Sequence, residues 1–130
     1  MVFLFIGCQG FDIKKAVIGK YYLVAVDVDE DLSLCYKADK QNGYSIIIDQ
    51  TIFAVGYGSK YIIVKQHPHE FASVLNKGNT NYYILPVYPQ DQDGIKKEVF
   101  GPFTEHQFEQ KKKDLNISNV EFTIVYKNLQ

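Results

Sequence analysis

Two histidines and a glutamate near the middle of the chain have side chains that bind transition metals. His67 and His69 flank Pro68, and Glu70 follows directly. In an extended segment, residues two positions apart point to the same side, so both imidazoles could reach one zinc ion. A zinc site takes at least three protein ligands, and no third ligand is evident from the spacing. Because Pro68 is typical of a surface turn, we interpret this segment as a turn and predict no metal site.

Alternate carboxylates at Asp27, Asp29 and Asp31 resemble the opening of a calcium-binding loop. The helix-loop-helix calcium motif continues with a glycine and ends on a bidentate glutamate, but Leu32 and Ala38 occupy those positions here. We therefore predict a solvated acidic turn. A second polar loop is interpreted in the same way and contains Asp91, Asp93 and Gly94.

Nucleophilic catalysis requires a Ser, Cys or Thr beside a base and an oxyanion pocket, and no strand-turn-helix nucleophile motif is present. Gly56 and Gly58 resemble half of a phosphate-binding loop, but the residues after them alternate like a strand, not like the start of a helix. His106 lies in the first turn of a predicted helix, where we expect it to be exposed. We predict a non-catalytic protein with no catalytic residues and no cofactor.

The basic residues do not favour nucleic-acid binding. All fourteen are lysines, and the formal net charge is -1. Arginine forks are the usual means of gripping phosphates and guanine edges, so a chain without them is a poor candidate for that class. Lys111, Lys112 and Lys113 are consecutive, and we interpret this run as the solvated face of a helix.

An apolar run at the start of the chain ends at Gly7 and Cys8. Together with Phe5 and Ile6, these residues resemble a bacterial lipobox, in which the cysteine thiol receives diacylglycerol and the small residue before it admits the signal peptidase. The pattern departs from the motif in two ways. Phe5 stands where leucine is usual, and the apolar run is short and lacks a preceding Lys or Arg.

Two interpretations of this start are open. In the first, residues 1–8 are the remainder of a lipoprotein signal whose beginning has been lost, Cys8 is the lipid attachment site, and residues 9–130 form a single globular domain. In the second, residues 2–6 form a buried edge strand and Cys8 is an ordinary core residue. We adopt the first. No apolar stretch approaches the roughly 20 residues that span a bilayer, so we expect membrane attachment through lipid alone.

The second cysteine, Cys35, lies in an alternating segment, where we expect a buried or half-buried free thiol. A disulfide with Cys8 is the alternative in an exported protein, unless lipid already occupies the Cys8 sulfur. Two distant cysteines do not form a metal site or a redox motif.

Composition and periodicity predict mostly β structure. Apolar residues make up 46% of the chain and aromatics 15%, a mixture that favours pleated surfaces. Period-two alternation and short apolar runs predict strands over residues 20–28, 31–37, 44–49, 51–55, 60–66, 81–88 and 119–127. Short turns, among them Asn42-Gly43, join the early strands into an antiparallel meander. Residues 67–80 break this pattern, and Phe71, Val74 and Leu75 indicate one or two helical turns there.

One helix is predicted over residues 103–117. Thr104 and Gln107 form a capping box, and Phe103 and Phe108 form a hydrophobic staple. Further along, Phe108, Lys112 and Leu115 share a face, and Asn116 suits a left-handed cap. The predicted fold is therefore α+β and mostly β: an antiparallel meander sheet, open or curled toward a barrel, with one C-terminal amphipathic helix packed on it before the last strand.

Several stretches together resemble an uncharacterised family of small bacterial lipoproteins, defined only as a domain of unknown function. They are the lipobox-like Cys8, GKYYLVAVDVDEDLSLCYK, TIFAVGYGSKYIIVKQHP and GPFTEHQFEQKKKDLNI. The likeness runs from Cys8 to about Tyr126. It implies an exported, lipid-anchored protein of the bacterial cell envelope, and it implies no activity.

Two functions follow as expectations. The first is a non-catalytic binding or protein-interaction module, held at the membrane by its N-terminal lipid, whose exposed tyrosines and loops contact an unknown partner. The alternative is a small β-barrel carrier with an apolar ligand in its aromatic interior. A lined internal cavity would indicate the carrier, and a filled core with an exposed apolar patch would indicate the interaction module. An enzyme would show polar groups of several types converging in a cleft.

Overall fold

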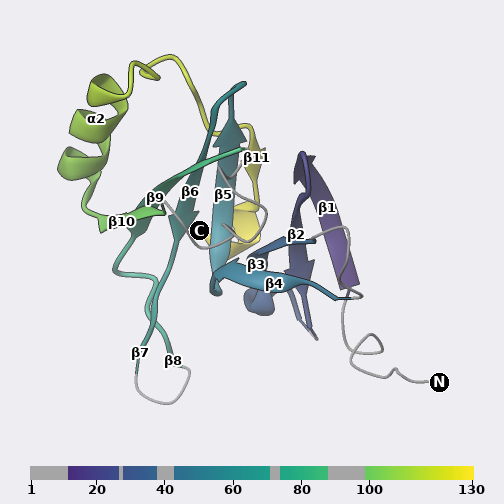
Figure 1. Ribbon diagram of the computed structural model, residues 1–130. Helices are drawn as coiled ribbons and strands as arrows, with labels where there is room; N and C mark the ends of the chain where they lie inside the picture. The colour runs from purple at the N-terminus through teal and green to yellow at the C-terminus, as the bar shows by residue number, and fades with distance from the viewer. Residues whose placement is uncertain (1–11, 27, 38–42, 71–73, 88–98) are drawn as a thin grey trace.

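The computed structural model describes residues 12–26, 28–37, 43–70, 74–87 and 99–130, which form two antiparallel sheets and one α-helix (Figure 1). Sheet A is a meander in the order β1-β2-β3-β4, with strands β1 (Asp12–Ile18), β2 (Tyr21–Ala25), β3 (Ser33–Tyr36) and β4 (Ser45–Ile48). Sheet B has the order β10-β9-β6-β5-β11, with strands β5 (Ile52–Tyr57), β6 (Tyr61–Gln66), β9 (Asn81–Pro86), β10 (Phe100–Phe103) and β11 (Ile124–Val125).

The remaining elements are short, apart from the helix. Strands β7 (His69–Glu70) and β8 (Val74–Leu75) form a two-stranded hairpin below sheet B in Figure 1. The helix α2 (Glu105–Asp114) follows β10 and precedes β11. Two 3-10 turns complete the described residues, η1 (Asp29–Asp31) and η3 (Lys127–Leu129).

Sheet B lies between sheet A and α2, so both of its faces are buried (Figure 1). On β6, Ile62 and Val64 pack in the cluster shared with sheet A, whereas Ile63 packs in the cluster under the helix. A strand covered on both faces needs apolar residues at successive positions, which explains the Ile-Ile-Val run. The tyrosine hydroxyl of Tyr21 also joins the sheets, since it donates to the Pro86 carbonyl oxygen at 3.2 Å.

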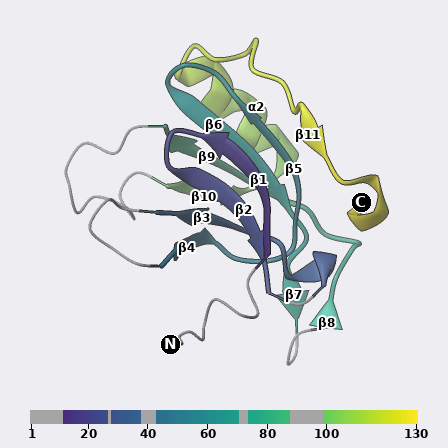
Figure 2. The same cartoon turned by 90° about the vertical axis from the view of Figure 1, so that its right-hand side faces the viewer.

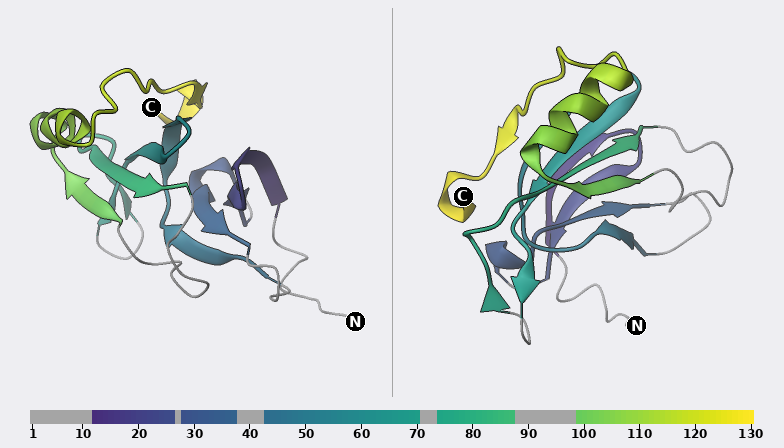
Figure 3. Two further views of the ribbon diagram at one scale, coloured as in Figure 1. Left: turned by 45° about the horizontal axis from the view of Figure 1, so that its top comes forward. Right: turned by 90° about the vertical axis from the view of Figure 1, so that its left-hand side faces the viewer.

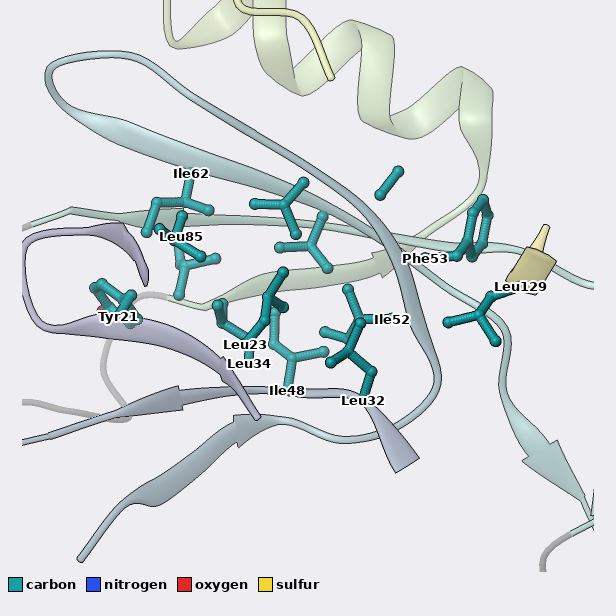
Figure 4. Packing of buried hydrophobic residues seen from close by; sticks show 14 of the residues in the cluster. Tyr21, Leu23, Leu32, Leu34, Ile48, Ile52, Phe53, Ile62, Leu85 and Leu129 are labelled. Atoms are coloured by element: carbon teal, nitrogen blue, oxygen red, sulfur yellow. The ribbon is translucent and has the colours of Figure 1, made fainter. Parts of the chain in front are cut away.

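The main core fills the space between the sheets (Figure 4). Its central side chains are almost fully buried and come from both sheets: Tyr21, Leu23, Leu34, Ile48, Ile52, Ile62 and Leu85. The smaller cluster beneath α2 contains Ile63, Tyr82, Ile84, Phe108, Ile117 and Val120. The predicted class, mostly β with one helix before the last strand, is confirmed, and the sheets are not closed into a barrel.

The break between the sheets occurs after β4, where the predicted meander leaves sheet A. Ile52 donates its backbone N–H to the Leu32 carbonyl at 2.9 Å, while Thr51 exchanges two backbone hydrogen bonds with His67. These bonds attach the beginning of β5 to both sheets. The single layer expected from the sequence is therefore two layers.

Several elements of the sheets differ from the prediction. Residues 12–18, for which no strand was predicted, form β1. The helical turns expected around Val74 and Leu75 are wrong, because these two residues form β8; Phe71 lies outside the described residues. The last strand is reduced to Ile124–Val125, although the predicted alternation persists around it.

The helix prediction is confirmed in its details but too long. The Thr104 hydroxyl accepts from the Gln107 N–H at 3.2 Å, and the Gln107 side chain accepts from the Thr104 N–H at 2.9 Å. These two bonds are the capping box. At the other end, Leu115 is the C-cap and Asn116 has the left-handed φ of 60°. Phe103, expected to be helical, ends β10 instead.

Figures 2 and 3 show which elements lie toward each end of the molecule. In Figure 2 and in the right-hand view of Figure 3, the β5–β6 turn and the segment that follows α2 lie toward the top. The start of β1 lies lower in these views, and the β7–β8 hairpin lies near the bottom.

Candidate functional site

An open cleft of about 310 Å³ lies where the β5–β6 turn meets the segment after α2. The turn contributes Gly58, Ser59, Lys60 and Tyr61. The segment after the helix contributes Leu115, Asn116, Ile117, Asn119 and Val120. The two walls are far apart in sequence, so the cleft is a product of the tertiary fold.

The second wall is shaped by the end of α2. The N–H groups of Leu115, Asn116 and Ile117 bond to carbonyl oxygens in the last helical turn. Asn116, with its positive φ, then reverses the chain, as a left-handed cap does. A further bond from the Val120 N–H to the Ile117 carbonyl at 3.0 Å tightens the following turn.

Lys112 holds this wall in place. Its side chain is buried, its Nζ donates to the Val120 carbonyl oxygen at 2.9 Å, and it lies 5.3 Å from the Phe108 ring centroid. The interpretation of residues 111–113 as a solvated face is therefore wrong for Lys112. Lys113 is exposed, and the half-buried Lys111 has its Nζ 4.4 Å from the Phe100 ring centroid.

Close backbone approach explains the two glycines before the cleft. A Cβ at Gly56 would overlap the carbonyl group of Glu121, and one at Gly58 would lie 3.2 Å from a methyl carbon of Val120. Gly56 thus lets residues 121–122 cross directly over β5, where Thr123 donates to the Val55 carbonyl at 3.0 Å. No phosphate loop is formed, since β6 follows the turn.

The lining of the cleft combines an apolar floor with polar side chains that are available to a ligand. Ile117 and Val120 are buried, and Leu115 and Tyr61 are half-buried. Within the described part of the chain, no hydrogen bond or ion pair engages the side chains of Ser59, Lys60, Asn116 and Asn119. Uncommitted polar groups around a concave apolar floor are what a small-ligand site needs. The sequence indicated none of these residues as site candidates.

The histidine pair is placed at the other end of sheet B and has structural contacts. His67 is buried, its ring stacks on Phe53 with a centroid distance of 4.1 Å, and its Nδ1 lies 2.7 Å from the Asn79 carbonyl oxygen. The Nε2 of His69 lies 2.8 Å from the Thr51 hydroxyl. Among the described residues no three His, Cys, Asp or Glu side chains are grouped to hold a metal. The expected surface turn is wrong for His67, because its ring belongs to the core.

A partly buried polar network continues from these residues across sheet B. The Gln66 side chain donates to the Asp49 carbonyl oxygen at 2.8 Å and accepts from Asn81 at 3.1 Å and Tyr83 at 3.3 Å. Its amide therefore has partners at both ends, and the network stabilises the junction of β5, β6 and β9.

The other residues that the sequence analysis considered as candidate sites are exposed, are buried, or lie outside the described residues. Asp29 and Asp31 lie in η1, where Asp31 accepts from the Val28 N–H at 3.3 Å. His106 is exposed, as expected. Cys35 is a buried free thiol, and burial, with a smaller contribution from Asp49, raises its pKa to about 11. The remaining candidates lie outside the described residues: Cys8, Asp27, Asp91, Asp93 and Gly94.

Comparison with known proteins identifies the family. Residues 18–127 match the family described as Protein of unknown function (DUF3997). The chain belongs to this family. The DUF3997 match includes both walls of the cleft and leaves Cys8 and most of β1 outside. No curated protein and no solved structure matched the chain. None of the helices in the described ranges is long and apolar enough to cross a membrane.

Proposed function

We propose that this DUF3997 protein is a non-catalytic binding module of the bacterial cell envelope, anchored through a lipid on Cys8. In this proposal it presents the cleft between the β5–β6 turn and residues 115–120 to its ligand. The lipobox-like residues before Cys8 support the anchor, and the position of the cleft relative to β1 supports the binding role.

The observation that carries the proposal is the position of β1. This strand begins at Asp12, only a few residues after Cys8. An extended chain spans at most about 3.5 Å per residue, so Asp12 would lie within about 14 Å of a lipid on Cys8. The start of β1 lies well away from the β5–β6 turn and from the segment after α2, which line the cleft (Figure 2 and the right-hand view of Figure 3). An anchor at Cys8 would therefore direct the cleft away from the bilayer.

The composition of the cleft supports binding over catalysis. Among the described residues that line it, the polar side chains are a hydroxyl, a phenol, two amides and one ammonium, with no carboxylate, imidazole or thiol. General acid-base and nucleophilic chemistry at neutral pH depend mostly on those missing groups. The barrel carrier receives no comparable support, since the sheets are open and the space between them is filled by buried side chains (Figure 4).

Metabolic labelling tests the anchor. The full-length product should incorporate radiolabelled palmitate in a bacterial host, and Cys8→Ser should abolish the labelling. Cys35→Ser is the matched control, since Cys35 is the other cysteine of the chain and is buried. Labelling that persists in Cys8→Ser, or that is absent from the unmodified chain, would remove the anchor from the proposal.

A further inference from the structure

We infer that the cleft between the β5–β6 turn and residues 115–120 binds a neutral, hydroxyl-rich small molecule, a mono- or disaccharide. The inference deepens the binding role proposed above and rests on it. It depends on which groups of the cleft are already engaged, on the chemistry of those that are not, and on the local charge.

The backbone groups of both walls are largely engaged. On the turn, Gly58 donates to the Tyr61 carbonyl at 3.0 Å, and Val87 donates to the Lys60 carbonyl at 2.9 Å. On the opposite wall, the Val120 carbonyl accepts from Lys112. A peptide that binds by adding a strand needs a row of unpaired backbone groups, and these walls do not provide one. Recognition in the cleft therefore falls to side chains.

The available side chains match hydroxyl groups. Asn116 and Asn119 each combine an acceptor oxygen with a two-hydrogen donor, and the hydroxyls of Ser59 and Tyr61 both donate and accept. A sugar hydroxyl has the same double character, so neighbouring hydroxyls on a ring can pair with one amide. The apolar floor is suited to the C–H face of the ring, and Tyr61 adds an aromatic surface with a polar tip.

The lining lacks the groups that proteins usually use to bind an anion. Lys60 is the one charged side chain among the described residues that line the cleft. The opposite wall begins at the C-terminal end of α2, where the lysines of the last turn offset the partial negative charge of the helix. Phosphate sites use helix N-termini or arginine forks, and the cleft has neither. A volume of about 310 Å³ is at the lower limit for small-ligand pockets, which restricts the ligand to one or two rings.

The test is a nuclear magnetic resonance titration of the full chain carrying Cys8→Ser, which keeps the protein free of lipid. Four probes are added separately: N-acetylglucosamine, its β-1,4-linked disaccharide, inorganic phosphate and acetyl-trialanine amide. We expect saturable shifts from a sugar at the backbone amides of residues 58–61 and 115–120, with little change elsewhere. Asn119→Ala should weaken sugar binding about tenfold, as the loss of one or two hydrogen bonds predicts. Asn128→Ala is the matched control, because Asn128 is also exposed but lies outside the cleft.

The outcomes separate the sugar from the binding role. Sugar shifts at the cleft that Asn119→Ala weakens and Asn128→Ala leaves unchanged support the inference. Shifts at the same amides from phosphate or the peptide, without a response to sugars, overturn the sugar and leave the binding role standing. The absence of saturable shifts from either sugar up to about 50 mM also overturns the inference, because weaker binding than that falls below any specific affinity. The palmitate-labelling experiment tests the lipid anchor, and its result does not depend on any of these titration outcomes.

Discussion

The Nζ of Lys112 donates a hydrogen bond of 2.9 Å to the carbonyl oxygen of Val120, and the lysine side chain is only 7% exposed. This bond connects the last turn of α2 to the chain that crosses back toward sheet B. A carbonyl in such a place has no access to bulk water, so its pairing determines whether the cleft wall keeps its shape.

Lys112→Met should destabilise the protein by about 1–3 kcal/mol, because methionine fills similar space but leaves the Val120 carbonyl without its donor. Lys113→Met is the control, since Lys113 is exposed on the same helix, and it should change stability by less than about 0.5 kcal/mol. Urea denaturation measures both. Equal midpoints for the two variants would show that the bond contributes nothing to stability.

Gly56→Ala should destabilise the protein by about 2 kcal/mol or more, because a Cβ would collide with the backbone of Glu121, which cannot move without displacing β11. At Gly43 an added Cβ would meet no atom within 4 Å, so Gly43→Ala serves as the control. Thermal unfolding of the two variants provides the comparison. A tolerated Gly56→Ala would mean that residues 121–122 do not cross β5 as described.

Stability should fall at alkaline pH. Burial raises the pKa of the Cys35 thiol from 9.0 to about 11 and that of the Tyr21 phenol from 10.0 to about 12, with smaller contributions from Asp49 and Tyr36 respectively. The folded state retains protons that the unfolded chain releases, so this contribution is complete below about pH 9 and is lost as pH rises toward 12.

Substitution of Cys35 should separate the contribution of the Cys35 thiol to the pH dependence of stability from that of the Tyr21 phenol. Urea midpoints of Cys35→Ala should fall less between pH 9 and pH 11 than those of the unmodified protein, while the Tyr21 contribution at higher pH remains. Ser33→Ala is the control, because Ser33 is buried on the same strand but has no proton to lose in this range. An unchanged slope in Cys35→Ala would contradict the assignment.

His67 should contribute to stability mainly through its ring. His67→Phe retains an aromatic ring against Phe53 and loses the Nδ1 contact with the Asn79 carbonyl, so we expect a cost of about 1 kcal/mol. His67→Ala also loses the stacked ring and should cost about 3 kcal/mol or more. Calorimetric unfolding temperatures rank the variants. If His67→Ala lowered the unfolding temperature no more than His67→Phe, a packing role for the His67 ring would be disproved.

Local signals in the sequence were sufficient for the elements that depend on local chemistry. The capping box of Thr104 and Gln107 and the left-handed Asn116 were predictable because each involves residues within one helical turn. Strands β2 and β6 were predictable because each has a local period-two pattern, although the structure buries side chains on both faces of these strands. Residues 12–18 were missed because Lys14 and Lys15 obscure the alternation, so edge strand β1 resembles a polar lead-in.

The cleft was not predictable from the sequence, because its walls meet only after sheet B and α2 have packed. Ser59, Lys60 and Asn119 are ordinary surface residue types, and nothing in their spacing indicates that they converge. The role of Gly56 was hidden for the same reason. Its lack of a side chain makes room for a distant segment, which the local sequence pattern does not show.

Residues 124–129 complete both sheet B and the main core. Ile124 pairs with Val55 on β5, and Leu129, only 2% exposed, enters the main core beside Phe53 (Figure 4). Sheet B therefore lacks an edge strand, and the core lacks one of its side chains, until residues 124–129 have been synthesised and have docked. Contacts between such distant segments form slowly compared with local ones. Strand β5 and the side of the main core around Phe53 therefore complete their packing late in folding, after residues 124–129 have docked.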